Sequence, residues 1–126
     1  MVLIDTHSHI YLSEFAGEVD QVIERSGKVG VEKIFLPNID STSVLPMLSL
    51  EARYPGTCFA MMGVHPTSVK ENYREELTLA ETWLQKRSFA GIGETGIDLY
   101  WDTTFQFKNK SKFFGINASG VINVSI

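Results

Sequence analysis

The sequence predicts an α/β fold in which parallel strands alternate with helices. Four short apolar runs recur at spacings of about 30 residues, and the segments between them carry apolar residues at helical spacing. The runs are continuous rather than alternating, which is typical of a parallel sheet covered by helices on one side and packed inside on the other. With 126 residues, 44% of them hydrophobic and 21% charged, the composition is that of one globular domain.

The predicted strands are short and each ends close to a turn-forming or polar residue. Proline offers no N–H to a sheet, so Pro37 is expected to end the second of them. The four predicted strands cover Val2–Thr6, Val31–Leu36, Cys58–Val64 and Phe89–Gly93.

Three helices are predicted between these strands. Gly27 and Gly30 suit the end of the first helix, and Asp40 or Ser41 can cap the second. Pro46 inside the second helix implies a late start or a kink. The predicted ranges are Glu14–Lys28, a helix running from Asp40 or Ser41 to about Arg53, and Asn72–Lys86.

Charge and cysteine usage narrow the class of protein. The net charge of −4 does not indicate a nucleic-acid-binding surface, and no apolar run approaches the ~18 residues that span a bilayer. The single cysteine, Cys58, cannot form an internal disulfide and is expected in the core. We therefore expect a cytoplasmic protein without a membrane partner.

The end of the chain differs in composition from the rest. All 15 acidic residues lie at or before Asp102, while residues 103–126 hold three lysines and no acid. We therefore divide the chain into residues 1–104 and a divergent tail, 105–126. One hypothesis for this tail is a shift of the reading frame near Gln106.

All three histidines fall at the carboxyl ends of predicted strands. His7 and His9 follow the first strand, two residues apart, so both rings can point to one face and reach one ion. Asp5 shares that face and is expected to orient a ligand. His65 follows the third strand and could bind metal or donate a hydrogen bond to a phosphate. The structural alternatives are a histidine pair in a turn and a loop cap at His65.

A carboxylate and several aromatic residues follow the fourth strand at the same edge. Glu94 lies between glycines that let a ligand approach, and its alternatives are a solvated loop carboxylate or a helix cap. Asp98, Tyr100 and Trp101 come soon after it. The aromatic rings could stack on a base or sugar, or could cover the top of the fold.

Three segments together carry a family resemblance. Asp5–His9, Gly63–Pro66 and Gly91–Trp101 resemble, in order and spacing, the TatD family of metal-dependent deoxyribonucleases, within the amidohydrolase-like barrel superfamily. The resemblance covers about residues 1–105, and its third segment is the most specific. It implies a (β/α)8 barrel, of which a chain this short holds the N-terminal half, since a whole barrel needs ~250 residues.

The resemblance also implies a two-metal centre and a reaction. His7 and His9 match ligands of one metal, Glu94 matches the catalytic carboxylate bridging both, and His65 lies near the phosphate. Asp98 and Tyr100 are expected to bind substrate. The expected ions are divalent, Mg²⁺ first and Zn²⁺ or Mn²⁺ as alternatives. The expected substrate is DNA, single-stranded or at 3′ ends, cleaved at phosphodiester bonds as a 3′-5′ exonuclease would.

The chain ends before the family's remaining ligands, a His-x-Arg on strand five, a histidine on strand six and an aspartate on strand eight. We therefore expect an incomplete centre, with little catalysis by these 126 residues alone. The alternatives are a non-catalytic, metal-binding half-barrel and another amidohydrolase-like enzyme acting on an amide or a phosphate monoester. Open edge strands predict self-association.

Overall fold

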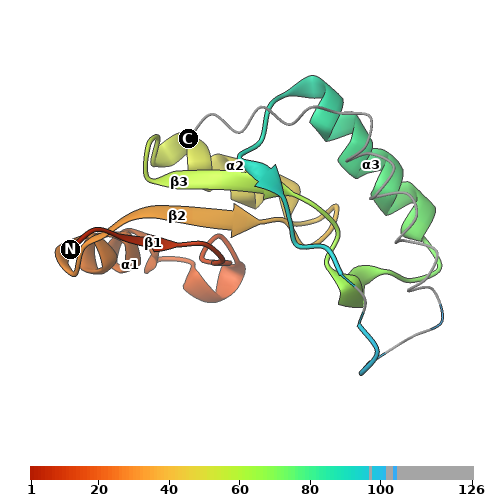
Figure 1. Cartoon of the computed structure of the whole chain (residues 1–126), viewed down its shortest axis with the longest axis horizontal. Helices are drawn as coiled ribbons and strands as arrows, with labels where there is room; N and C mark the ends of the chain where they lie inside the picture. Colours follow the sequence, from red (N-terminus) through yellow and green to blue (C-terminus); the bar gives the residue numbers. More distant parts are fainter. Residues whose placement is uncertain (97, 102–103, 105–126) are drawn as a thin grey trace.

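The computed structural model describes residues 1–96, 98–101 and 104 (Figure 1). Four strands form one parallel sheet in the order β1-β2-β3-β4: β1 (Leu3–Asp5), β2 (Val31–Pro37), β3 (Cys58–Met62) and β4 (Gly91–Ile92). The helices are α1 (Val19–Lys28), α2 (Val44–Arg53) and α3 (Tyr73–Lys86), with 3-10 turns η1 (Ser13–Phe15) and η2 (Pro66–Ser68). This is the alternation of half a (β/α)8 barrel, so the predicted fold class is confirmed.

Two helix starts depend on single residues. The sequence predicts that the first helix begins at Glu14, whereas α1 begins at Val19. Gly17 interrupts it with a φ of +86°, which is outside the helical region. The late start that Pro46 implies is confirmed, because α2 begins at Val44 and holds the proline in its first turn, where a missing N–H costs nothing.

The fourth strand is shorter than predicted. Its regular part is Gly91–Ile92, paired with Met61 and Met62 of β3. Flanking backbone bonds continue toward the predicted limits, from Ala90 N to Ala60 O (2.9 Å) and from Gly93 N to Met62 O (3.0 Å). Because β4 is the last strand of the described sheet, it has a ladder on one side only, which leaves a short regular segment.

The core lies between the sheet and its helices. Alternate residues of β2 and β3 point toward the helices and are buried there, where they meet apolar side chains of α2 and α3. Figure 1 shows α1 and α2 behind the sheet. The buried set on this side comprises Ile34, Leu36, Cys58, Ala60, Met62, Val44, Met47, Leu50, Leu77 and Ala80. The expected core position of Cys58 is confirmed.

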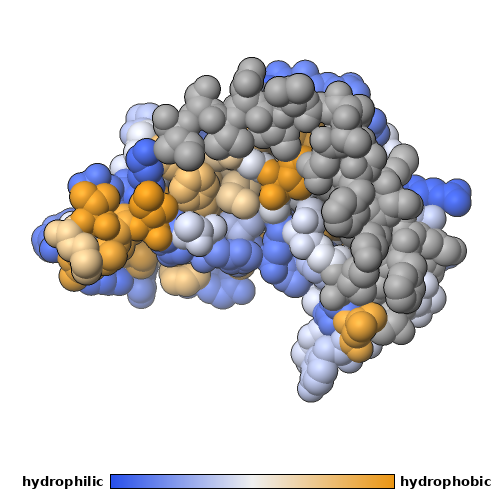
Figure 2. All heavy atoms as spheres, viewed as in Figure 1, coloured by the Kyte–Doolittle hydropathy of each residue, from blue (hydrophilic) through white to orange (hydrophobic). Residues whose placement is uncertain are grey.

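The opposite face of the sheet is only half-buried in the described part of the chain. Phe35 and Phe59 stack there, with ring centroids 5.4 Å apart. The prediction of a sheet packed inside as well as outside is therefore wrong for these residues: the apolar runs are continuous in sequence, but their burial alternates. Figure 2 shows hydrophobic side chains at the β1 edge, where Val2 and Ile4 are 62% and 50% exposed.

The expectation about the tail lies outside the described residues, and the expectation that no segment spans a membrane can be examined only within them. The tail at 105–126, with its hypothesis of a shifted reading frame, falls there. Within the described ranges, no helix combines the length and apolar character needed to cross a membrane.

The burial of Cys58 predicts its reactivity. Burial, with a smaller effect of the nearby Glu51 carboxylate, raises the pKa of the Cys58 thiol to about 11. Since the thiolate is the nucleophile, we expect native Cys58 to react with a disulfide reagent at least ~100-fold more slowly than in the unfolded chain at about pH 8. Absorbance kinetics with and without guanidinium check this, and equal rates would contradict the burial of β3.

Gly63 offers a second test of packing, with a matched control. A Cβ at Gly63 would lie 2.6 Å from the backbone carbonyl carbon and oxygen of Gly93, whereas one at Gly27 in α1 meets nothing within 4 Å. We expect Gly63→Ala to lower the free energy of unfolding by about 1–3 kcal/mol, because backbone must shift. Gly27→Ala should leave it unchanged or raise it by at most about 1 kcal/mol. Urea unfolding of both variants measures the difference, and similar values would contradict the close approach.

Candidate metal centre

Four side chains from three strand ends meet at one edge of the sheet. His7 and His9 follow β1, His65 follows β3 and Glu94 follows β4. The strands are parallel, so their carboxyl ends share this edge. The predicted convergence of these residues is therefore observed.

The Glu94 carboxylate lies at the centre of the group. Its Oε2 is 3.0 Å from Nε2 of His7 and 3.4 Å from Nε2 of His9. The two imidazole nitrogens are 3.1 Å apart. Although Oε2 is buried and close to both rings, it has no hydrogen-bond partner of suitable geometry among the described residues. A buried carboxylate oxygen without a donor is costly, so it calls for a ligand.

These spacings suit a single metal ion. Ligand atoms at ~2.1 Å from one ion, with angles between octahedral and tetrahedral, lie roughly 3.0–3.4 Å from one another. The ligating atoms of His7, His9 and Glu94 all lie within 4.8 Å of each other, and the shorter separations fall in that range. Two imidazoles and a carboxylate are a donor set that Zn²⁺ and Mn²⁺ accept. Mg²⁺ prefers oxygen ligands, so within this set it favours the Glu94 carboxylate.

His65 faces Glu94 from the other side. Its Nε2 lies 3.2 Å from Oε1 of Glu94. Its Nδ1 accepts a hydrogen bond of 3.1 Å from the backbone N–H of Thr67 and lies 2.7 Å from the Thr67 hydroxyl. A nitrogen that accepts a bond cannot carry the proton, so the neutral ring has its proton on Nε2. His65 is thus a donor toward Glu94 rather than a third imidazole ligand.

His9 is the more enclosed member of the histidine pair. Its side chain is 24% exposed, against 49% for His7. Burial and then the neighbouring His7 lower the pKa of His9, against the opposing effect of Glu94. A neutral imidazole is the form that binds metal. Nδ1 of His9 lies 2.9 Å from the hydroxyl of Tyr11, which also contacts the Pro37 carbonyl.

A buried amide holds the ends of β2 and β3 together. Asn38, only 1% exposed, donates from Nδ2 to Gly63 O (2.8 Å) and to Asp40 O (3.1 Å). Its Oδ1 accepts a bond of 2.7 Å from the Ser43 hydroxyl. The backbone N–H of His65 donates to Ile39 O at 2.7 Å. These bonds set the position of the backbone that carries His65.

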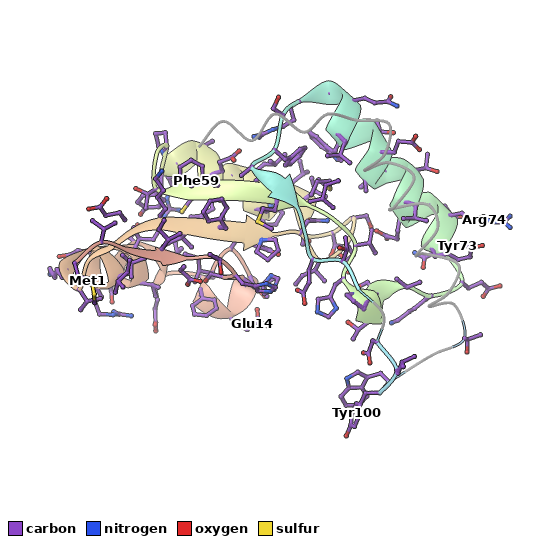
Figure 3. The ribbon with its side chains drawn as sticks, viewed as in Figure 1. Met1, Glu14, Phe59, Tyr73, Arg74 and Tyr100 are labelled. Carbon is purple, nitrogen blue, oxygen red and sulfur yellow. The ribbon has the colours of Figure 1, made fainter. Side chains whose placement is uncertain are left out.

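The substrate residues predicted after Glu94 are placed differently. Oδ1 of Asp98 accepts from the backbone N–H groups of Tyr100 (2.7 Å) and Trp101 (3.3 Å), which shapes a turn. The rings of Tyr100 and Trp101 meet edge to face at 4.9 Å, and both are more than 70% exposed. Figure 3 places Tyr100 at the tip of a segment extending away from the sheet, so the structure does not bring it into the histidine cluster.

Asp5 acts differently from the expectation, and the structure adds three residues to the site. Asp5 accepts from the backbone N–H of His7 (3.0 Å), so it orients the turn rather than an imidazole ring. The three added residues, which the sequence patterns do not single out, are Tyr11, Asn38 and Thr67. Asn38 follows the end of β2, and the rule that polar residues at strand ends carry chemistry could have found it. Thr67, two residues after His65, is a hydroxyl residue in position for a local cap.

Known proteins resemble this chain over most of its described length. The family model described as TatD related DNase matches residues 4–116. The uncharacterized metal-dependent hydrolase YabD of Bacillus subtilis (strain 168) is 27% identical over 101 residues, which is 80% of this chain and 39% of that protein. The 3'-5' ssDNA/RNA exonuclease TatD of Yersinia pseudotuberculosis is 35% identical over 89 residues, 68% of this chain and 33% of that one.

A solved structure shares the fold. The TatD homologue YJJV from Escherichia coli K12 superposes with a TM-score of 0.77 at 25% sequence identity, over 92% of this chain and 47% of that one. The chain thus spans a third to two-fifths of these two curated relatives and about half of the solved protein. On the match over residues 4–116, the chain belongs to the TatD related DNase family.

Proposed function

We propose that this chain supplies the metal-binding part of a hydrolase that cleaves phosphodiester bonds of DNA, in single strands or at 3′ ends. The observation that carries the proposal is the buried Oε2 of Glu94, which lies between the Nε2 atoms of His7 and His9 and has no well-directed hydrogen bond from the described residues. The names of relatives support the substrate class: the Yersinia protein is a 3'-5' ssDNA/RNA exonuclease, and a Danio rerio relative is a putative deoxyribonuclease.

The residues of the centre have separate roles in this proposal. His7, His9 and Glu94 hold a divalent ion, with Mg²⁺ tested first and Zn²⁺ or Mn²⁺ as alternatives. When bound, such an ion polarises a phosphoryl oxygen and makes a water molecule more acidic. Glu94 is the catalytic carboxylate, with Oε2 toward the metal-binding histidines and Oε1 toward His65.

The remaining roles concern substrate. His65 Nε2–H, held as a donor by Thr67, is suited to an anionic phosphate oxygen. Tyr100 is suited to stacking on a base beyond the metal centre, because its ring is exposed. Asp98 supports that stacking position through its two backbone hydrogen bonds.

We further propose that residues 1–104 form the hydrolase part, with residues 105–126 as a separate tail, and that the protein works in the cytoplasm.

Exposed apolar residues on β1 support self-association at that edge. Light scattering as a function of concentration would show it, and a monomer at every concentration would contradict it.

The metal-binding role of Glu94 can be tested directly. We expect Glu94→Gln to weaken binding of Mn²⁺ or Zn²⁺ by at least about 10-fold, because a neutral amide is a poorer ligand than a carboxylate. Isothermal titration calorimetry measures the affinity. Glu24→Gln is the matched control, since Glu24 is exposed on α1 and contacts Lys28. Equal affinities for the two variants would overturn the assigned ligand set.

Hydrolysis decides between an enzyme and a non-catalytic binder. We expect single-stranded DNA labelled at its 5′ end to be shortened from the 3′ end in the presence of Mg²⁺, and the activity to be abolished by EDTA and by Glu94→Ala. The expected rate is low, since the chain covers only part of its relatives. Metal binding without any cleavage would favour the non-catalytic half-barrel instead.

A further inference from the structure

We propose that Tyr11 is a positioning residue for His9, and that its hydroxyl keeps the proton of the neutral imidazole on Nδ1 and leaves the Nε2 lone pair free for a metal ion. The inference rests on the proposed function in one respect, the role of His9 as a ligand. The arrangement of the hydrogen bonds is independent of that role.

Tyr11 is buried behind the histidine cluster. It is 8% exposed, and its ring meets that of His9 edge to face with centroids 5.7 Å apart. Its hydroxyl lies 2.5 Å from the carbonyl oxygen of Pro37 and 2.9 Å from Nδ1 of His9. Pro37 is the last residue of β2, so the hydroxyl is anchored to the sheet itself.

The hydroxyl has one proton, and the Ser43 side chain interacts with it in addition to His9 and Pro37. The carbonyl oxygen of Pro37 can only accept, and at 2.5 Å two lone pairs would repel each other unless the Tyr11 proton lay between them. The proton is therefore donated to Pro37. What remains toward His9 is a lone pair of the Tyr11 oxygen, so the 2.9 Å contact is a hydrogen bond only if His9 Nδ1–H donates.

This places the lone pair of a neutral His9 on its other nitrogen. Nε2 of His9 is the atom that lies 3.1 Å from Nε2 of His7 and 3.4 Å from the buried Oε2 of Glu94. Metal-binding histidines commonly donate their second nitrogen to an acceptor that fixes the tautomer. Here the acceptor is the hydroxyl oxygen of Tyr11, because the Tyr11 proton is donated to the carbonyl oxygen of Pro37.

The hydrogen bond at Nδ1 of His65 runs in the opposite direction to the one at Nδ1 of His9. There a backbone N–H of Thr67 donates to Nδ1, which leaves the proton on Nε2. The partner on Nδ1 thus sets the function of each ring: an acceptor behind His9 gives a ligand, and a donor behind His65 gives a proton donor.

The tautomer can be read without metal or substrate. We expect ¹⁵N–¹H correlation spectra of the metal-free protein, at about pH 8 where a histidine of ordinary pKa near 6.5 is neutral, to show His9 protonated on Nδ1. His65 should show its proton on Nε2 in the same spectrum. Tyr11→Phe should move the His9 proton to Nε2, while Tyr54→Phe, which removes a hydroxyl bound to Asp20, should not.

Metal affinity gives a second measurement. Removing an outer hydrogen-bond partner typically costs 10–100-fold, so we expect Tyr11→Phe to weaken Zn²⁺ binding by about that factor and Tyr54→Phe to leave it unchanged. The His65 signals report whether Tyr11→Phe is folded. If that variant fails to fold, the wild-type spectrum alone decides, because a His9 proton on Nε2 overturns the proposal. An unchanged tautomer and affinity in folded Tyr11→Phe overturn it as well. Absence of DNA hydrolysis by the unsubstituted protein would count against the proposed function, not against this assignment.

Discussion

The candidate centre depends on how closely the carboxyl ends of neighbouring strands are held. Asn38, buried at the end of β2, donates to the carbonyl of Gly63 at the end of β3. Gly63 in turn has no room for a side chain, because the backbone of Gly93 and Glu94 lies against it. A hydrogen bond and a close backbone contact therefore link three successive strands, and they place His65 and Glu94 at a fixed separation. A site built on strand ends gains precision from this kind of support.

A second network extends that support away from the sheet. The Glu76 carboxylate of α3 is 7% exposed and accepts bonds of 2.7 Å from both the backbone N–H and the hydroxyl of Ser41. It thereby ties α3 to the loop that leads into α2. Since the same loop contacts the His65 backbone through Ile39, a helix that carries none of the four side chains of the centre contributes to its geometry. A buried carboxylate satisfied in this way favours one arrangement over others.

The two faces of the sheet differ in what they contribute. The helix-covered face holds Leu36, Ala60 and Met62 with no exposure, and this burial supplies the main hydrophobic stabilisation. The other face leaves Phe35 and Phe59 half-buried in the described part of the chain, although both are residues that a barrel interior would enclose. The centre is thus carried by a sheet that is well packed on one side, which is consistent with a chain that spans only part of its relatives.

The sequence alone was enough to predict the α/β alternation, the approximate limits of β2, β3, α2 and α3, and the strand ends at which His7, His9, His65 and Glu94 lie. Periodic apolar runs and turn residues are local properties, so they can be read along the chain. The folded arrangement was needed to show which nitrogen of each histidine faces Glu94. It also showed that Oε2 receives no well-directed hydrogen bond from the described residues, and that Tyr11, Asn38 and Thr67 support the centre. Those features depend on contacts between residues that are distant in the sequence, such as His7 with Glu94, or Tyr11 with Pro37 at 26 positions, and no local pattern encodes their distances.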